Sequence, residues 1–86
     1  MDKQIKQELV RQLEESWPDA LTRLENLFDA DARLREICTE YEDVIRCRRS
    51  LSQQTERDLG KFDEYTALLR ELETELLSIF SEHRSP

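Results

Sequence analysis

The chain of 86 residues is 37% hydrophobic and 38% charged, with a formal net charge of −7. Average soluble proteins are ~45–50% apolar, so we expect one small domain with too little apolar material for a thick core. A chain this acidic is repelled by nucleic-acid backbone and by anionic membranes, so neither is an expected partner. No apolar run approaches the length of a membrane span, and the first ten residues lack a signal-peptide core. We therefore expect a cytoplasmic protein.

A first helix is expected from about residue 2 to residue 15. Asp2 is a favourable residue type for the helix N-cap. Ile5, Leu9 and Leu13 recur at every fourth position, which places them in a narrow apolar stripe along one side of the helix.

Pro18 separates this helix from the next. Proline disfavours helical geometry in the residue before it, here Trp17, yet it is favoured in the first turn of a helix. The first helix is therefore expected to end near Glu15, and the second to begin near Pro18.

Two long helices with heptad patterns follow, and we expect them at about residues 18 to 49 and 55 to 82. Apolar residues at the first and fourth positions of each heptad form one stripe, which is buried when it faces a second helix. The stripe of the second helix consists of Leu27, Ala30, Leu34, Ile37, Tyr41, Val44 and Leu51. The stripe of the third consists of Phe62, Tyr65, Leu69, Leu72, Leu76 and Ile79. They predict an all-α chain in which a short N-terminal helix precedes a long antiparallel helical hairpin.

The turn of the hairpin has two candidate positions. Residues 50 to 55 are rich in Ser and Gln, whereas Gly60 offers a rival turn with Asp63 as the cap of the next helix. We favour the first position, because it keeps Phe62 within the stripe of the third helix.

A two-helix hairpin leaves several apolar residues without cover. They are Ile5, Leu9, Leu13, Leu24, Ile45, Leu77 and Phe80. Exposed together, they would form a larger apolar patch than soluble monomers usually tolerate. Burial against a symmetric copy is the commonest solution. The sequence therefore predicts a homodimer with a four-helix core, or a tetramer as the alternative.

One stretch resembles the small bacterial YdcH-like proteins. Trp17-Pro18-Asp19 is followed by Leu24, Leu27, Asp31, Leu34, Ile37, Glu40-Tyr41 and Val44, and this spacing matches the pattern of that family. Residues 69 to 76 resemble the family's second helix more loosely, with acidic residues where the family usually has basic ones. The resemblance implies a small bacterial cytosolic helical hairpin with no established enzymatic activity.

Positive charge gathers around the predicted turn. Five basic residues and two acidic ones lie between positions 46 and 61, and the basic ones are Arg46, Arg48, Arg49, Arg57 and Lys61. This distribution places a basic tip on an acidic body, and the four arginines are candidates for docking an anionic partner. Alternatively, the three arginines at 46, 48 and 49 complement the negative end of the helix dipole.

Trp17, the only tryptophan, is a further candidate for partner binding. It either packs over the junction of the first two helices or anchors a partner, as tryptophans often do at interfaces.

No residue pattern indicates catalysis or cofactor binding. Cys38 and Cys47 would face opposite sides of one helix, too far apart for a disulfide, so Cys38 is expected to be a small buried hydrophobe. His83 has no cysteine or histidine at metal-ligand spacing. A single glycine excludes a Gly-rich phosphate loop. We therefore expect no enzyme, no metal site and no cofactor.

Two functions remain. The first is a small self-associating coiled-coil protein that acts through protein–protein interaction, as an adaptor, an assembly factor or a regulator. The second is an acidic inhibitor that imitates nucleic acid and blocks a basic nucleic-acid-binding partner. A continuous apolar strip outside the hairpin would favour the first, and regularly spaced exposed carboxylates on one face would favour the second. We prefer the first, because the apolar stripes are the better-defined pattern.

Overall fold

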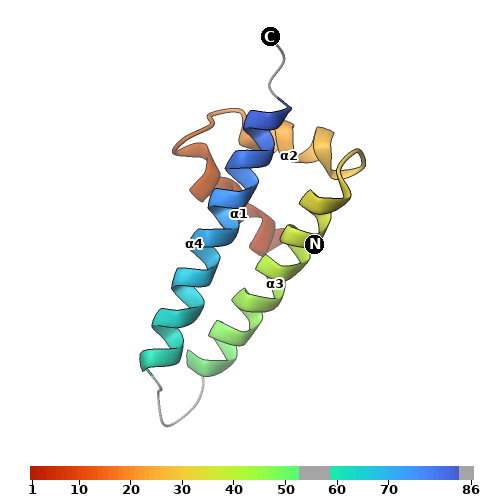
Figure 1. Cartoon of the computed structure of the whole chain (residues 1–86). Coiled ribbons are helices and arrows are strands. Elements are labelled where there is room, and N and C mark those ends of the chain that lie inside the picture. Colours follow the sequence, from red (N-terminus) through yellow and green to blue (C-terminus); the bar gives the residue numbers. More distant parts are fainter. Residues whose placement is uncertain (53–58, 84–86) are drawn as a thin grey trace.

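The computed structural model describes residues 1–52 and 59–83, and these residues are helical apart from short connections (Figure 1). The described helices are α1 (Lys3–Glu14), α2 (Ala20–Phe28), α3 (Ala32–Ser52) and α4 (Leu59–Glu82). α3 and α4 lie side by side and antiparallel, α1 crosses behind them, and α2 lies near the end remote from their connection. The molecule measures 50 × 20 × 19 Å. The predicted all-α class, with a short N-terminal helix before a long hairpin, is confirmed.

Helix α1 begins where the sequence predicts. The Asp2 carboxylate accepts hydrogen bonds from the backbone N–H groups of Gln4 (2.9 Å) and Ile5 (3.2 Å). These N–H groups have no partner within the helix, so the cap satisfies them. The buried residues of α1 are Ile5, Leu9, Val10 and Leu13.

The predicted single helix from residue 18 to 49 is wrong, because the chain forms two helices, α2 and α3, with a break at residues 29–31. The Asp31 carboxylate accepts a hydrogen bond from the N–H of Leu34 (3.2 Å) at the start of α3. The Arg35 guanidinium donates to the carbonyls of Phe28 (2.7 Å) and Asp29 (3.0 Å) at the end of α2. The break leaves backbone N–H and C=O groups without a partner inside a helix. Asp31 and Arg35 supply hydrogen bonds to such groups on both sides of the break.

Asp31 also connects this break to the far end of α4. The Nε2 atom of His83 lies 2.9 Å from Oδ2 of Asp31. This hydrogen bond, helped by the one from the Leu34 N–H, lowers the pKa of Asp31. The fold therefore favours the ionised carboxylate. Its contribution to stability is present above the unfolded pKa and is lost as the pH falls through the lowered folded-state pKa.

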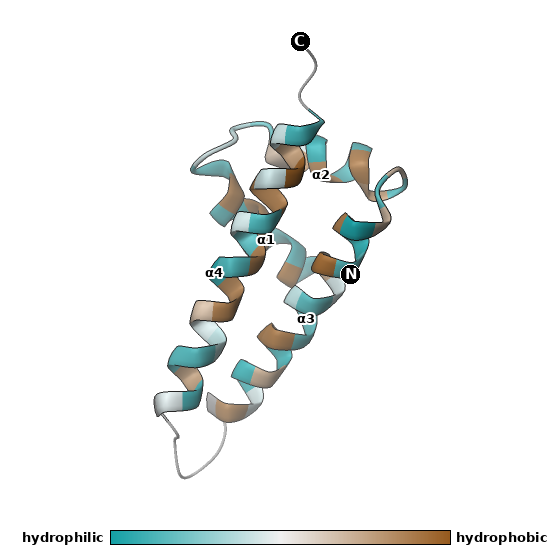
Figure 2. Cartoon of the chain, viewed as in Figure 1, coloured by the Kyte–Doolittle hydropathy of each residue, from teal (hydrophilic) through white to brown (hydrophobic). Residues whose placement is uncertain are grey.

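The hairpin packs along the two predicted stripes, and Figure 2 shows apolar residues recurring along the facing sides of α3 and α4. The buried members are Leu34, Ile37, Tyr41 and Leu51 of α3, with Leu69, Leu72, Leu76 and Ile79 of α4. At their ends the predicted stripes include residues that are exposed instead of buried. Phe62 is 38% exposed, and Ala30 lies exposed in the break before α3.

The predicted turn at residues 50–55 begins too early, because α3 continues through Ser52. The rest of that turn, and the predicted start of the third helix near residue 55, lie outside the described residues. The rival turn at Gly60 is wrong, since this residue and Asp63 both lie inside α4.

The residues assigned to a dimer interface are covered within one chain. Buried among them are Ile5, Leu9, Leu13, Leu24, Ile45 and Phe80, while Leu77 is partly buried against the same core. The expectation that they lack cover is wrong, because α1 packs on α2 and α4, and α2 packs on α3. The argument for a dimer or a tetramer therefore disappears, although the oligomeric state itself stays a prediction.

Leu72→Ala should lower the free energy of unfolding by about 2–4 kcal/mol, the usual cost of truncating a buried leucine. Leu72 is 3% exposed. Leu77→Ala should cost clearly less, because the Leu77 side chain is only partly buried and already meets water. Urea denaturation followed by circular dichroism measures both. Equal losses would contradict the packing of α4.

Sedimentation equilibrium at micromolar concentration should give the monomer mass of 10.3 kDa, because a single chain covers its own apolar residues. A stable dimer would show instead that a second copy covers surface left open here, for which Phe62 and Leu68 are the exposed large apolar residues on α4.

Candidate interaction surfaces

Two arginines of the predicted basic tip form ion pairs within the chain. Arg46 pairs with Glu42, one turn earlier on α3. Arg49 pairs with Glu8 of α1 at 3.3 Å. Arg57 lies outside the described residues. The tip is therefore not a surface of free arginines, and part of its charge holds α1 against α3.

Arg48 is held between α3 and α4. It is half-buried, and its guanidinium donates to Oγ1 of Thr66 (3.3 Å). The same group lies 5.4 Å from the centroid of the Phe62 ring, within the range of a cation–π contact. Arg48 therefore has a fixed position, which the charge pattern of the sequence does not reveal.

Trp17 takes the packing role among its two predicted roles. It is partly buried against the core, and its ring meets that of Phe80 edge to face, with centroids 6.0 Å apart and an interplanar angle of 80°. The Arg23 guanidinium lies 4.5 Å from the centroid of the indole ring. With these contacts the geometry favours a junction residue over an exposed anchor for a partner.

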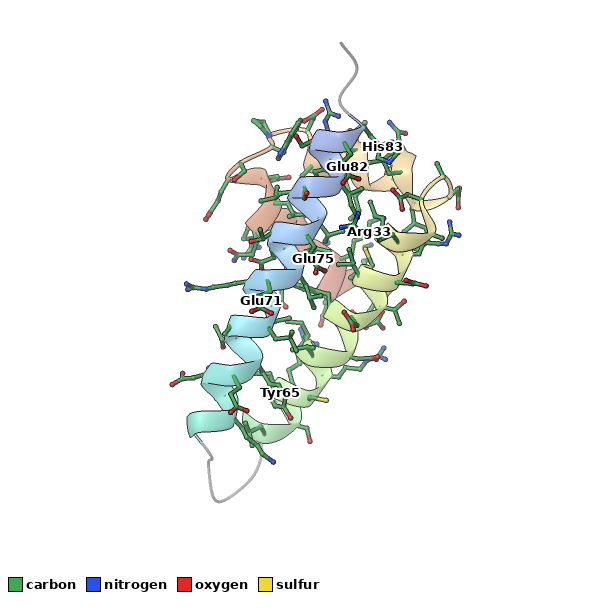
Figure 3. The ribbon with its side chains drawn as sticks, viewed as in Figure 1. Arg33, Tyr65, Glu71, Glu75, Glu82 and His83 are labelled. Carbon is green, nitrogen blue, oxygen red and sulfur yellow. The ribbon has the colours of Figure 1, made fainter. Side chains whose placement is uncertain are left out.

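Exposed carboxylates gather on the side of the hairpin shown in Figure 3, where Glu71 and Glu75 project from α4. We term the following set the acidic face: Glu36, Glu40 and Asp43 on α3, with Glu71 and Glu75 on α4. No side chain among the described residues forms an ion pair or hydrogen bond with any of the five. None of these five carboxylates therefore has a direct ion-pair partner among the described residues.

The spacing of these carboxylates puts them in two rows. Steps of four and three residues place Glu36, Glu40 and Asp43 on one side of α3, about one turn apart. Glu75 and the first two of these residues line one shallow groove of about 400 Å³, together with Ile37. Three of the five carboxylates, from both helices, therefore line the same groove.

Arginines that line the same or neighbouring groove already have other partners. Arg33 pairs with Glu82 at 3.6 Å. Arg35 donates to the two carbonyls at the end of α2. Arg35 is therefore held away from the acidic face, whereas Arg33 lies in the groove and offsets part of its negative charge.

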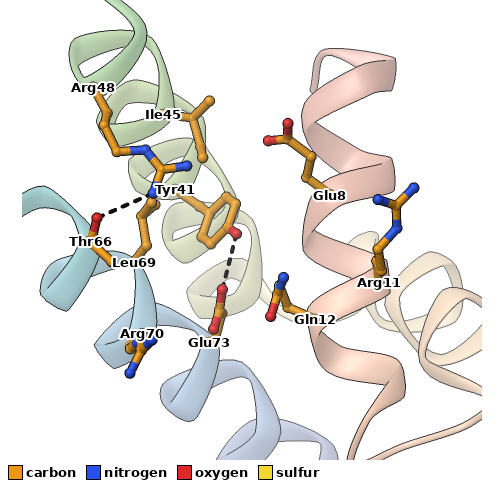
Figure 4. A pocket seen from close by; sticks show the side chains of 10 residues that line it. All are labelled: Glu8, Arg11, Gln12, Tyr41, Ile45, Arg48, Thr66, Leu69, Arg70 and Glu73. Atoms are coloured by element: carbon orange, nitrogen blue, oxygen red, sulfur yellow. Dashed lines mark hydrogen bonds between the residues drawn. The ribbon is translucent and has the colours of Figure 1, made fainter. Parts of the chain in front are cut away.

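A polar cleft of about 350 Å³ lies where α1 crosses the hairpin, and it is drawn in Figure 4. At its centre the Tyr41 hydroxyl donates to Oε1 of Glu73 (3.1 Å). The pKa of Tyr41 is raised, mainly by burial and secondly by the negative charge of Glu73. The hydroxyl therefore keeps its proton and its donor role well above neutral pH.

Neither a metal site nor a membrane span was found in the part of the chain that the structure describes. Within residues 1–52 and 59–83, no three His, Cys, Asp or Glu side chains group closely enough to hold a metal ion. No helix in these ranges is long and apolar enough to cross a membrane.

No family model, curated protein or solved structure matches the chain. The resemblance of residues 17–44 to the YdcH-like proteins stays a prediction.

The two cysteines should differ sharply in their reactivity with a thiol reagent such as dithionitrobenzoate. Cys38 is 2% exposed, and burial raises its pKa to about 11, whereas Cys47 is exposed. The thiolate is the reacting species, so one thiol should react quickly and the other only after unfolding. Cys38→Ala and Cys47→Ala variants assign the phases. Fast reaction of Cys38 in the folded protein would contradict its placement in the core.

Proposed function

We propose that this protein acts through protein–protein interaction, and that its acidic face binds a basic surface or segment of the partner. The observation that carries this proposal is the pair of carboxylate rows on α3 and α4, which are exposed and form no direct ion pair with the described residues. Such a field attracts a cationic partner and speeds its association. An adaptor or a regulator of a larger assembly would use a surface of this kind.

The groove between the rows suits lysine and arginine side chains in particular. Ile37 lies in the groove beside Glu36, Glu40 and Glu75. The aliphatic stem of a lysine or arginine packs on apolar surface while its charged end reaches a carboxylate. A basic segment would therefore gain both kinds of contact along α3.

Docking by a continuous apolar strip has less support. The exposed large apolar residues in the described ranges are Met1 before α1, Leu21 on α2, and Phe62 and Leu68 on α4. Phe62 and Leu68 share α4, but six residues place them about 120° apart around its axis. Apolar self-association through the hairpin is therefore the weaker proposal.

The acidic inhibitor is the second candidate and a narrower form of the same proposal, since it too would act through a protein–protein contact at the acidic face. It is favoured by the spacing of the carboxylates, which repeat at about one helical turn along two adjacent rows, since nucleic acid also presents regularly repeated negative charge. In this reading the basic partner is a nucleic-acid-binding protein. Displacement of a DNA probe from the captured partner in a gel-shift assay would separate this candidate from a simple adaptor.

Neutralising the acidic face should weaken binding of a fluorescent decalysine peptide by about tenfold or more in low salt. The test variant is Glu36→Gln/Glu40→Gln/Glu75→Gln. The matched control is Glu14→Gln/Glu15→Gln/Asp29→Asn, which removes the same charge from exposed residues outside the acidic face. Fluorescence anisotropy measures both dissociation constants.

The cellular partner is tested with the same proteins. Affinity capture followed by mass spectrometry should retain a partner on the unaltered chain and on the control, and lose it on the test variant. Equal weakening by both variants would mean that net charge, and not this surface, determines binding.

A further inference from the structure

We propose that the polar cleft between α1 and the hairpin is a binding site for a small organic anion. The ligand class joins an oxyanion group, phosphate or carboxylate, to a compact apolar body. The cleft shares no residue with the acidic face, so this inference does not depend on the proposed function.

The shape of the cleft fits a small ligand. Its volume of about 350 Å³ lies within the range of ~300–1,000 Å³ typical of ligand pockets. Ile45 and Leu69 lie at its base and are 1% and 4% exposed, so they give it a small apolar floor. In Figure 4, Glu8 and Gln12 of α1 point across the cleft towards the hairpin. Polar groups from three helices therefore surround an apolar base.

The two acidic residues of the cleft already have donors. Glu73 accepts the hydroxyl hydrogen of Tyr41 at 3.1 Å. Glu8 accepts a hydrogen bond from Arg49 (3.3 Å), which is not among the residues that line the cleft. Arg49 therefore offsets the charge of Glu8, and neither bond uses Arg11 or Arg70.

Three guanidinium groups outnumber these two carboxylates. Arg11, Arg48 and Arg70 line the cleft from α1, α3 and α4 respectively. Arg48 is fixed by Thr66 and the Phe62 ring. Arg11 and Arg70 form no ion pair or side-chain hydrogen bond with another described residue.

The chemistry of these arginines selects the ligand. A guanidinium carries five N–H donors in a planar fork that matches carboxylate and phosphate geometry. In a chain of net charge −7, Arg11 and Arg70 therefore bring to the cleft two guanidinium groups that pair with no described side chain, above a small apolar floor. An anion with a compact apolar body satisfies both features.

The test is an amide-resolved NMR titration of the full chain with four probes of similar size. Phenyl phosphate and benzoate carry the two oxyanions, benzyl alcohol is neutral, and benzylamine is cationic. The expected result is saturable shifts at residues of the cleft for at least one anion, with a dissociation constant of about 1 mM or lower. The stronger anion identifies the oxyanion that the site prefers.

Arg11→Gln/Arg70→Gln should weaken the preferred anion by about tenfold or more, because it removes two charged donors. Lys3→Gln/Arg33→Gln makes the same change in net charge at exposed residues that do not line the cleft, and should leave affinity within about twofold. The spectrum of each free variant reports directly whether the fold is retained.

Three results would overturn the proposal. The first is no saturable shift up to about 10 mM of either anion. The second is binding of benzyl alcohol or benzylamine that equals or exceeds that of both anions. The third is equal weakening by the two paired variants, which would assign the effect to net charge.

Discussion

The break between α2 and α3 is the constraint on which the rest of the fold depends. An uninterrupted helix would carry residues 20–28 straight on from α3, away from the core. Because the chain turns at residues 29–31, Ala20 and Leu24 join the same buried cluster as Phe80. Asp31 and Arg35 supply the hydrogen bonds that the interruption removes from the helix ends. The turn thereby lets the same chain cover apolar residues for which an open hairpin would need a second copy.

This arrangement gives the two sides of the hairpin different chemistry. α1 crosses one side, where it buries apolar residues, pairs Glu8 with Arg49, and creates the cleft. None of the described helices covers the opposite side, and its outer positions on α3 and α4 hold the acidic face. Of the two arginines beside that face, Arg35 binds carbonyls at the α2–α3 break, and Arg33 pairs with Glu82 at the end of α4 while it still lines the acidic groove. Covering the core and leaving one surface charged are therefore linked consequences of the same packing.

The hairpin could be predicted because its apolar residues recur with the heptad period of packed helices. Stripes such as Leu69, Leu72 and Leu76 specify a helix and its buried side without knowledge of the partner. The break was not predictable in this way, since residues 29–31 contain neither glycine nor proline, and two of the side chains that stabilise it, Arg35 and His83, follow later in the chain. Residues such as Ile5 and Phe80 were correctly expected to need cover. Whether a second copy or the same chain supplies that cover depends on tertiary packing, which periodicity does not encode.

Charge was harder to interpret from the sequence than apolar pattern, and the reason is physical. The arginines near residue 48 are close together along the chain, which suggested one basic tip. In the fold Arg49 meets a glutamate 41 residues away, and Arg48 meets Thr66 18 residues away.

By contrast, the spacing of Glu36, Glu40 and Asp43 is a local property of one helix and could be read from the sequence. What could not be read was whether any cation reaches them. An ion pair is decided by the direction of long, flexible side chains after the backbone has folded, so sequence reasoning finds rows of charge but not their neutralisation. The unpaired carboxylates, rather than the clustered arginines, are therefore the charge feature that the fold leaves open for a partner.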